Sequence, residues 1–159
     1  MRYKHLVVTC LLLVLSVGCD NSGTAMKTEK HNELGMLPKL LSLPRQPLSV
    51  KWTIEESTDR GSLRALLQFS AADKTFILNN SPEFEIKTND RLDAELFDSW
   101  LPEEARAEIE TQRQGDEYEL LGVVPLQPDL FTQNEMSPYV NGSVTPLGDG
   151  YVLVWLYAM

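Results

Sequence analysis

The sequence predicts an α+β fold, in which a small antiparallel sheet of about five or six strands carries two or three helices on one face. Segments with alternating apolar and polar residues, typical of half-buried strands, flank a central stretch with helical spacing. The resulting order of elements, β-β-α-β-α-α-β-β-β, favours one antiparallel sheet with segregated helices. The 159 residues, 43% of them hydrophobic, suffice for one domain with a packed core.

The first two strands are predicted to form a hairpin. Apolar residues alternate with polar ones from Leu48 to Ile54, which indicates a half-buried strand. Residues 58–62 have the composition of a turn. The alternation resumes from Leu63 to Phe69, so this segment is the expected partner strand.

A helix and a short strand are expected next. Ser70 and Asp73 have the spacing of a capping box, with Asp in place of the usual Glu, and predict a helix to about Asn79. Phe84 and Ile86 indicate a short strand after it.

Two further helices are predicted in the middle of the chain. Asn89 or Asp90 can cap the second helix, because short polar side chains accept hydrogen bonds from free N–H groups. Pro102 fits the first turn of the third helix, and Gly115 is a natural stop.

The C-terminal part predicts three strands. The first covers residues 118–124 and is followed by a loop over residues 125–135. Asn141-Gly142 is the best short hairpin signal in the chain, and residues 148–150 make another tight turn. Residues 151–157 are apolar on both faces, which is typical of a central strand.

The N-terminus has the pattern of an export signal. Arg2 and Lys4 precede an apolar run over residues 6–17. At 1.5 Å per residue this run is too short to cross a bilayer core of about 30 Å. We therefore expect residues 1–18 to be a cleaved signal peptide.

Residues 15–19, Leu-Ser-Val-Gly-Cys, resemble the lipobox of bacterial lipoproteins, although Ser16 stands where that family usually has Leu. The resemblance implies that Cys19 receives a diacylglyceryl thioether, becomes the first mature residue after cleavage, and is then N-acylated. Several acyl chains anchor a protein stably, whereas one binds marginally. The membrane is thus an expected partner, reached through the lipid.

Asp20 and Asn21 resemble the retention signal of enterobacterial lipoproteins, which implies the inner membrane, facing the periplasm, rather than the outer membrane. Residues 19–36 are polar and without periodicity, so we expect a flexible tether. The single globular domain is expected over residues 37–159.

The mature chain is strongly acidic. Without Arg2 and Lys4 it has 12 basic and 23 acidic residues, a net charge of −11, so nucleic acid is not an expected partner. Residues 88–130 hold twelve acids and three arginines, which makes an exposed acidic face from two helices. That face is either a solvated surface or a site for a cationic partner. Its candidate residues are Glu103, Glu104, Glu108, Glu110, Glu117 and Glu119.

The expected domain lacks the cysteine and histidine residues that most often carry catalysis. Cys10 and His5 lie in the signal, Cys19 carries lipid, and His31 falls in the expected tether. We therefore expect no catalytic residue, no metal site and no cofactor. Trp52 and Trp155 lie in apolar strand patterns that favour the core.

Trp100 lies between two predicted helices and is the tryptophan expected to be exposed. A sugar-stacking platform built from the three tryptophans is the functional alternative to a place in the core.

The leading hypothesis is a non-enzymatic, lipid-anchored interaction module. It would be an accessory subunit, or an inhibitor or immunity-type protein, for a cationic envelope or secreted protein. One alternative is a cell-wall glycan-acting enzyme that pairs Glu103 or Glu104 with Glu117 or Glu119. The other is a binder of small hydrophobic ligands.

Overall fold

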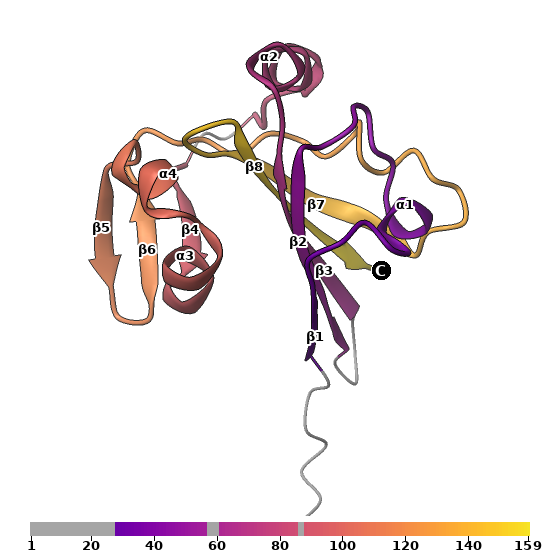
Figure 1. Ribbon diagram of the computed structural model, residues 1–159, viewed down its shortest axis with the longest axis horizontal. Coiled ribbons are helices and arrows are strands. Elements are labelled where there is room, and N and C mark those ends of the chain that lie inside the picture. The colour runs from indigo at the N-terminus through magenta and orange to yellow at the C-terminus, as the bar shows by residue number, and fades with distance from the viewer. Residues whose placement is uncertain (1–27, 57–60, 86–87) are drawn as a thin grey trace, which may run out of the picture.

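The computed structural model describes residues 28–56, 61–85 and 88–159, which form two antiparallel sheets and short helices (Figure 1). The larger sheet contains β1 (Thr28–His31), β2 (Ser49–Glu56), β3 (Gly61–Gln68), β8 (Tyr151–Ala158) and β7 (Tyr139–Pro146), in that order. The smaller sheet contains β4 (Asp90–Asp93), β6 (Glu117–Leu120) and β5 (Thr111–Gln114), in that order. The helices are α1 (Leu37–Leu40), α2 (Ala71–Asn80), α3 (Ala94–Trp100) and α4 (Glu103–Ala107). The predicted α+β class is confirmed, but the prediction of one sheet is wrong, because the strands divide into two.

One face of the five-stranded sheet is the more completely covered of the two. Leu63, Ala65 and Leu67 of β3 point to this face and are completely buried. They pack in one cluster with Leu37 of α1 and Ile77 of α2. This cluster is the main core of the protein.

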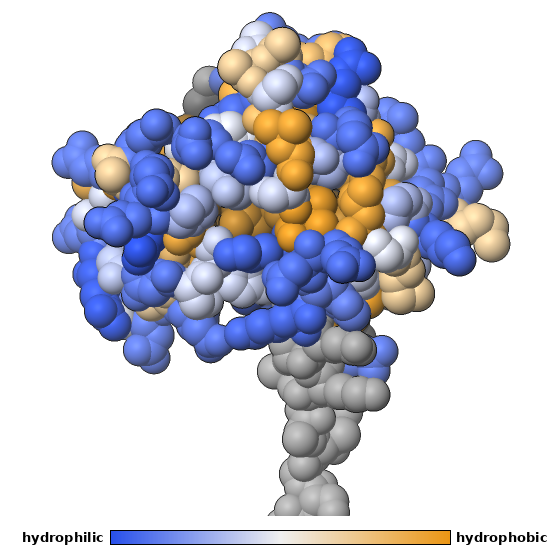
Figure 2. Space-filling model, viewed as in Figure 1, coloured by the Kyte–Doolittle hydropathy of each residue, from blue (hydrophilic) through white to orange (hydrophobic). Residues whose placement is uncertain are grey.

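The opposite face is covered only in part. Leu66 of β3 and Leu153 of β8 join a second cluster, which contains Leu96 of α3 and Ala105 of α4. The helices therefore contact both faces of the large sheet, and not one face as the sequence suggested. Figure 2 shows that the small sheet and its helices are almost entirely hydrophilic on their outer side, whereas apolar residues gather in the middle of the view, below α2.

Several local predictions are confirmed. β2 and β3 pair as a hairpin along their whole length, from Ser49 opposite Gln68 onward. Ser70 caps α2, since its Oγ accepts the N–H of Asp73 at 3.1 Å. β8 is a central strand between β3 and β7, and the tight turn before it contains Asp149, which has a positive φ of 45°.

The second predicted helix is present as α3, but it begins at Ala94 and not at Asn89 or Asp90, because residues 90–93 first form strand β4. Its last residue, Asp93, is the residue that caps α3. The third helix begins after Pro102 as predicted but ends at Ala107, and Gly115, with φ +65°, lies in the turn between β5 and β6. β4 and β5 are short and polar, so they lack the alternation by which strands are recognised. β6 overlaps the strand predicted over residues 118–124 but ends at Leu120.

The Asn-Gly pair does not make a hairpin turn. Asn141 and Gly142 lie inside β7, next to a shift in its pairing with β8 between Tyr139 and Asn141. Gly142 has a φ of +148°, and a Cβ there would lie 1.9 Å from the carbonyl oxygen of Trp155. Glycine is required here because the bulge needs a positive φ and because β7 and β8 approach too closely to leave room for a Cβ atom.

The folded part begins nine residues earlier than predicted. Thr28 is already in β1, whose residues pair with β2, and Leu37 is fully buried, so the interpretation of residues 28–36 as flexible tether is wrong. The indole Nε1 of Trp52 donates to the carbonyl of Glu33 at 2.8 Å, and the His31 ring stacks on Trp52 at 4.0 Å. Contacts with the buried Trp52 therefore fix β1 and the residues after it against β2, although the polar sequence of β1 does not predict a strand.

The expected signal peptide, Cys19, Asp20 and Asn21 lie outside the described residues, as does Ile86 of the short strand expected near Phe84. In the part of the chain that the structure describes, no helix is long and apolar enough to cross a membrane.

Candidate functional site

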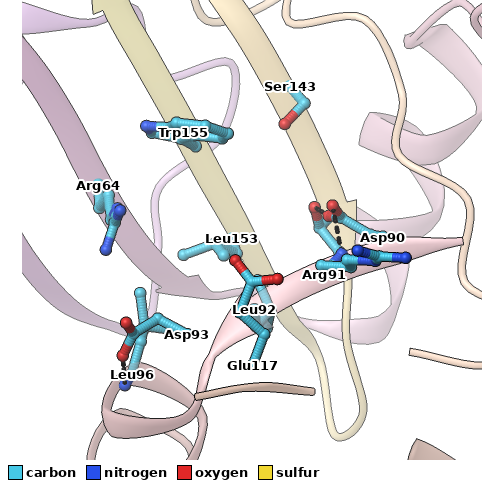
Figure 3. Close-up of a pocket in the computed structure, with 11 residues that line it drawn as sticks. Arg64, Asp90, Arg91, Leu92, Asp93, Leu96, Glu117, Ser143, Leu153 and Trp155 are labelled. Atoms are coloured by element: carbon cyan, nitrogen blue, oxygen red, sulfur yellow. Dashed lines mark hydrogen bonds between the residues drawn. The ribbon is translucent and has the colours of Figure 1, made fainter. Parts of the chain in front are cut away.

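The partly covered face of the large sheet forms the floor of a groove, and the small sheet with α3 forms its wall. We call this the cross-sheet groove. Its centre is a cavity of about 140 Å³ between Trp155 and Arg64 on one side and Asp93 and Glu117 on the other (Figure 3). The hollow continues past Thr53 towards β1. The groove therefore runs across the strands.

The floor is a single row of cross-strand neighbours. Thr53 of β2 pairs with Arg64 of β3, and Arg64 pairs with Trp155 of β8, which pairs in turn with Ser143 of β7. Lys30 of β1 continues the row at the other end. Strand pairing therefore fixes the order of these side chains along the groove, because neighbouring strands lie about 4.8 Å apart.

Trp155 is the exposed aromatic residue of the groove. Its side chain is 44% exposed although β8 is a central strand, whereas Trp100 is 7% exposed. The predictions for these two residues are both wrong. Leu153, two residues earlier on the same face, is covered by α3 and the small sheet, and Trp155 lies just beyond that cover. The only sequence signal for an exposed site on this face is the charged residue Arg64 within an apolar strand. The pairing of Arg64 with Trp155 cannot be read from the sequence.

Two ion pairs lie along the groove. Arg64 lies 3.5 Å from Glu55 and places its guanidinium 5.7 Å from the centre of the Trp155 ring. Lys30 lies 3.0 Å from Glu95 and so joins β1 to α3 across the groove. The second pair is strongly exposed, so its contribution to stability is small.

Thr53 lines the groove and has a buried hydroxyl group that is unsatisfied. Its side chain is only 2% exposed, and Oγ1 has no hydrogen-bond partner among the described residues. Burial of a hydroxyl without a partner costs about 1–3 kcal/mol. A group that fills the groove and bonds to Thr53 would recover this energy.

The wall supplies carboxylates in different environments. Asp93 Oδ1 accepts the N–H groups of Glu95 at 2.8 Å and Leu96 at 3.2 Å, which fixes the start of α3. Glu117 is exposed and reaches towards the cavity, and it has no ion pair or side-chain hydrogen bond within the described residues (Figure 3). Glu117 is therefore the free anion opposite Trp155.

Asp90 is a half-buried carboxylate of the groove. It accepts hydrogen bonds from the Thr145 hydroxyl and from the Arg91 N–H. Burial raises the pKa of Asp90 above its ordinary value, and the two hydrogen bonds oppose that rise. Its ionised form is consequently less favourable in the folded protein than in water.

The structure separates the six acids of the predicted acidic face. Glu117 and Glu119 lie on β6 and line the groove. Glu103 and Glu104 are exposed in the first turn of α4, and Glu110 is exposed after that helix. The structure therefore does not bring the pairs considered for glycan hydrolysis, one from each group, together in the groove.

Glu108 has a structural contact. Its Oε2 accepts the backbone N–H of Asp149 at 2.7 Å, which ties the end of α4 to the turn between β7 and β8. Lys74 of α2 donates to the Leu147 carbonyl in the same turn. Burial lowers the pKa of Lys74, while Glu108 and Asp149 act to raise it.

His31 belongs to the fold and not to a tether, so the expectation of a domain without histidine is wrong. Its ring is occupied by stacking on Trp52. No group of three or more His, Cys, Asp or Glu side chains within residues 28–56, 61–85 and 88–159 is placed to hold a metal ion.

No known family, no curated protein and no solved structure matches this chain. The functional argument therefore depends on the groove itself. It offers one aromatic surface, a free carboxylate and an unsatisfied hydroxyl, and this set of groups suits binding.

Proposed function

We propose that this chain is a lipid-anchored protein of the bacterial envelope whose domain binds a partner through the cross-sheet groove and performs no catalysis. The anchor would be Cys19, with Asp20 and Asn21 retaining the protein in the inner membrane, facing the periplasm. The half-exposed Trp155 carries the proposal. A large apolar side chain on a central strand contributes little to stability when it faces solvent, whereas Trp and Arg dominate binding energies at protein interfaces.

The charges of the groove favour a cationic partner. Six acidic and three basic side chains line it, which gives a formal net charge of −3. They are Glu55, Asp90, Asp93, Glu95, Glu117 and Glu119 against Lys30, Arg64 and Arg91. An accessory subunit, or an inhibitor or immunity-type protein, would bind its partner in this way.

Crosslinking in cells tests the proposal. The tagged, anchored protein is crosslinked and its partners are identified by mass spectrometry, with Cys19→Ser as the unanchored control and Trp155→Ala as the groove variant. We expect one dominant envelope partner, lost in both variants. A partner that Trp155→Ala retains would contradict a role for the groove.

A matched charge comparison locates the surface. Neutralising Glu117 and Glu119 should weaken the crosslink, whereas neutralising Glu103 and Glu104 on α4 changes the net charge equally and should leave it intact. The reverse result would move the binding surface to α4.

A glycan-acting enzyme is the second candidate, because Asp90 lines the groove and burial shifts the pKa of its carboxyl upward, the direction that a general acid requires. Hydrolysis of chitotetraose or peptidoglycan by the purified protein, lost in Asp90→Asn, would support this alternative. The third hypothesis, a binder of small hydrophobic ligands, is not supported by the groove. Pockets for such ligands are typically about 300–1,000 Å³ and mostly apolar, whereas the central cavity is smaller and more polar.

A further inference from the structure

We propose that the cross-sheet groove binds an extended, cationic polypeptide segment, in which a Lys or Arg side chain lies between the Trp155 ring and the Glu117 carboxylate and a nearby N–H group donates to Thr53 Oγ1. This inference depends on the proposed binding function and names the class of ligand.

The first contact is a cation site. A guanidinium or ammonium group is attracted to the face of a tryptophan within about 6 Å. Arg64 already occupies such a position at 5.7 Å, but Glu55 neutralises it at 3.5 Å. Glu117, across the cavity, has no such partner within the described chain, so a second cation would find both a ring face and an uncompensated carboxylate.

The second contact is a hydrogen-bond site. Thr53 Oγ1 is buried and unsatisfied, and it lies two strands from Trp155 along the floor. At about 4.8 Å per strand the two contacts are about 10 Å apart, which an extended chain covers in three residues. One short segment can therefore make both contacts at once.

A neutral or acidic glycan fits this groove less well. Sugar hydroxyls could stack and bond here, but they would leave the charge of Glu117 uncompensated. A ligand that carries carboxylates would be repelled by the excess of acids. Charge complementarity therefore selects a basic peptide over a cell-wall glycan.

Tryptophan fluorescence gives a direct readout, because Trp52 and Trp100 are buried and Trp155 is exposed. The full-length protein in neutral detergent would be titrated with the peptide acetyl-Gly-Arg-Gly-Arg-Gly-Arg-Gly-amide. Its matched control replaces each Arg by citrulline, which keeps the shape and removes the charge. We expect at least tenfold weaker binding of the citrulline peptide, and equal binding of the two peptides would overturn the inference.

Variants at three positions test the contacts. Glu117→Gln and Thr53→Val should each weaken binding of the arginine peptide at least fivefold in the fluorescence titration. Trp155→Phe and Trp155→Ala lack the reporting indole and are compared by calorimetry, in which Trp155→Phe should weaken binding less than Trp155→Ala. Glu135→Gln, on the loop beside α1, makes the same charge change away from the groove and should leave the affinity unchanged. Equal losses in Glu117→Gln and Glu135→Gln would mean that only net charge matters, and would overturn the site.

Thr53→Val separates binding from folding. Loss of an unsatisfied buried hydroxyl should leave the urea midpoint unchanged or raise it, so weaker binding in this variant cannot come from unfolding. Unchanged affinity in Thr53→Val would remove the second contact.

Chitotetraose distinguishes this inference from the function on which it depends. Trp155-dependent binding of chitotetraose without binding of the arginine peptide would overturn the cationic ligand and keep the groove as a binding surface. No response to either probe, with a cellular partner retained by Trp155→Ala, would overturn both proposals.

Discussion

The two faces of the five-stranded sheet are made by alternate residues of the same strands, yet they differ in almost every property. Trp52, on the covered face, is buried and hydrogen-bonded, whereas Trp155, on the groove face, is half exposed beside Arg64. The covered face carries the main core, whereas the groove face combines a second, smaller apolar cluster with charged, free or unsatisfied groups. Because side chains alternate in a strand, one sheet can separate stability from recognition.

Replacement of the two tryptophans should give opposite results. Trp52→Ala opens a cavity in the main core and should lower the free energy of unfolding by about 3–5 kcal/mol. Trp155→Ala removes an exposed ring and should cost less than about 1 kcal/mol while it abolishes binding. Urea denaturation measures both. If Trp155→Ala lowered the free energy of unfolding as much as Trp52→Ala, the groove face would contribute to stability as the covered face does, which would contradict the comparison.

The bulge beside Trp155 should be sensitive to a single methyl group. Gly142→Ala places Cβ 1.9 Å from the Trp155 carbonyl oxygen, so β7 and β8 must separate, at a cost of about 2–3 kcal/mol. Gly122→Ala is the matched control, since its φ is also positive, at +74°, but nothing lies within 4 Å. It should cost about 1 kcal/mol. Thermal unfolding compares the two, and equal shifts would exclude the close contact as the cause.

The wall of the groove should depend on the cap of α3. Asp93→Ala removes the acceptor for two N–H groups and should cost about 1 kcal/mol. Asp129→Ala, an exposed loop residue, serves as control and should have almost no effect. Urea midpoints would show the difference, and a loss confined to the control would refute the role of the cap.

The smallest effect should appear as a pH dependence. Burial raises the pKa of Asp90 above its ordinary value of 3.8, so between that value and the raised one the folded state holds more protons than the unfolded state. The free energy of unfolding contributed by this group therefore falls as pH rises through that interval. Asp90→Asn removes the titration, so its stability relative to the native protein should rise over the same interval. A constant difference between pH 3 and pH 8 would contradict the assignment.

The sequence predicted what local chemistry determines. The β2–β3 hairpin, the Ser70 cap and the tight turn before β8 depend on residues a few positions apart. β4 escaped prediction because its partners are distant, with Asp90 opposite Leu120, and because its own four residues have no clear period.

The candidate site escaped prediction for a related reason. Nothing near Trp155 in the sequence shows that Arg64 and Ser143 are its neighbours, or that the cover of the groove face ends at Leu153. The acidic residues were visible from composition, but their division between β6 and α4 is a property of the fold.

The entry of Thr28 into the sheet limits where the groove can operate. If Cys19 carries the lipid, as proposed, nine steps of the chain separate the membrane from β1, and at 3.3–3.6 Å each they span at most about 30 Å. The tether would confine the domain to a thin layer above the bilayer. A partner in the same membrane would then have a high effective concentration around the groove. Insertion of ten Gly and Ser residues before Thr28 should then weaken the crosslink to a membrane partner, whereas a freely diffusing partner would be captured equally well.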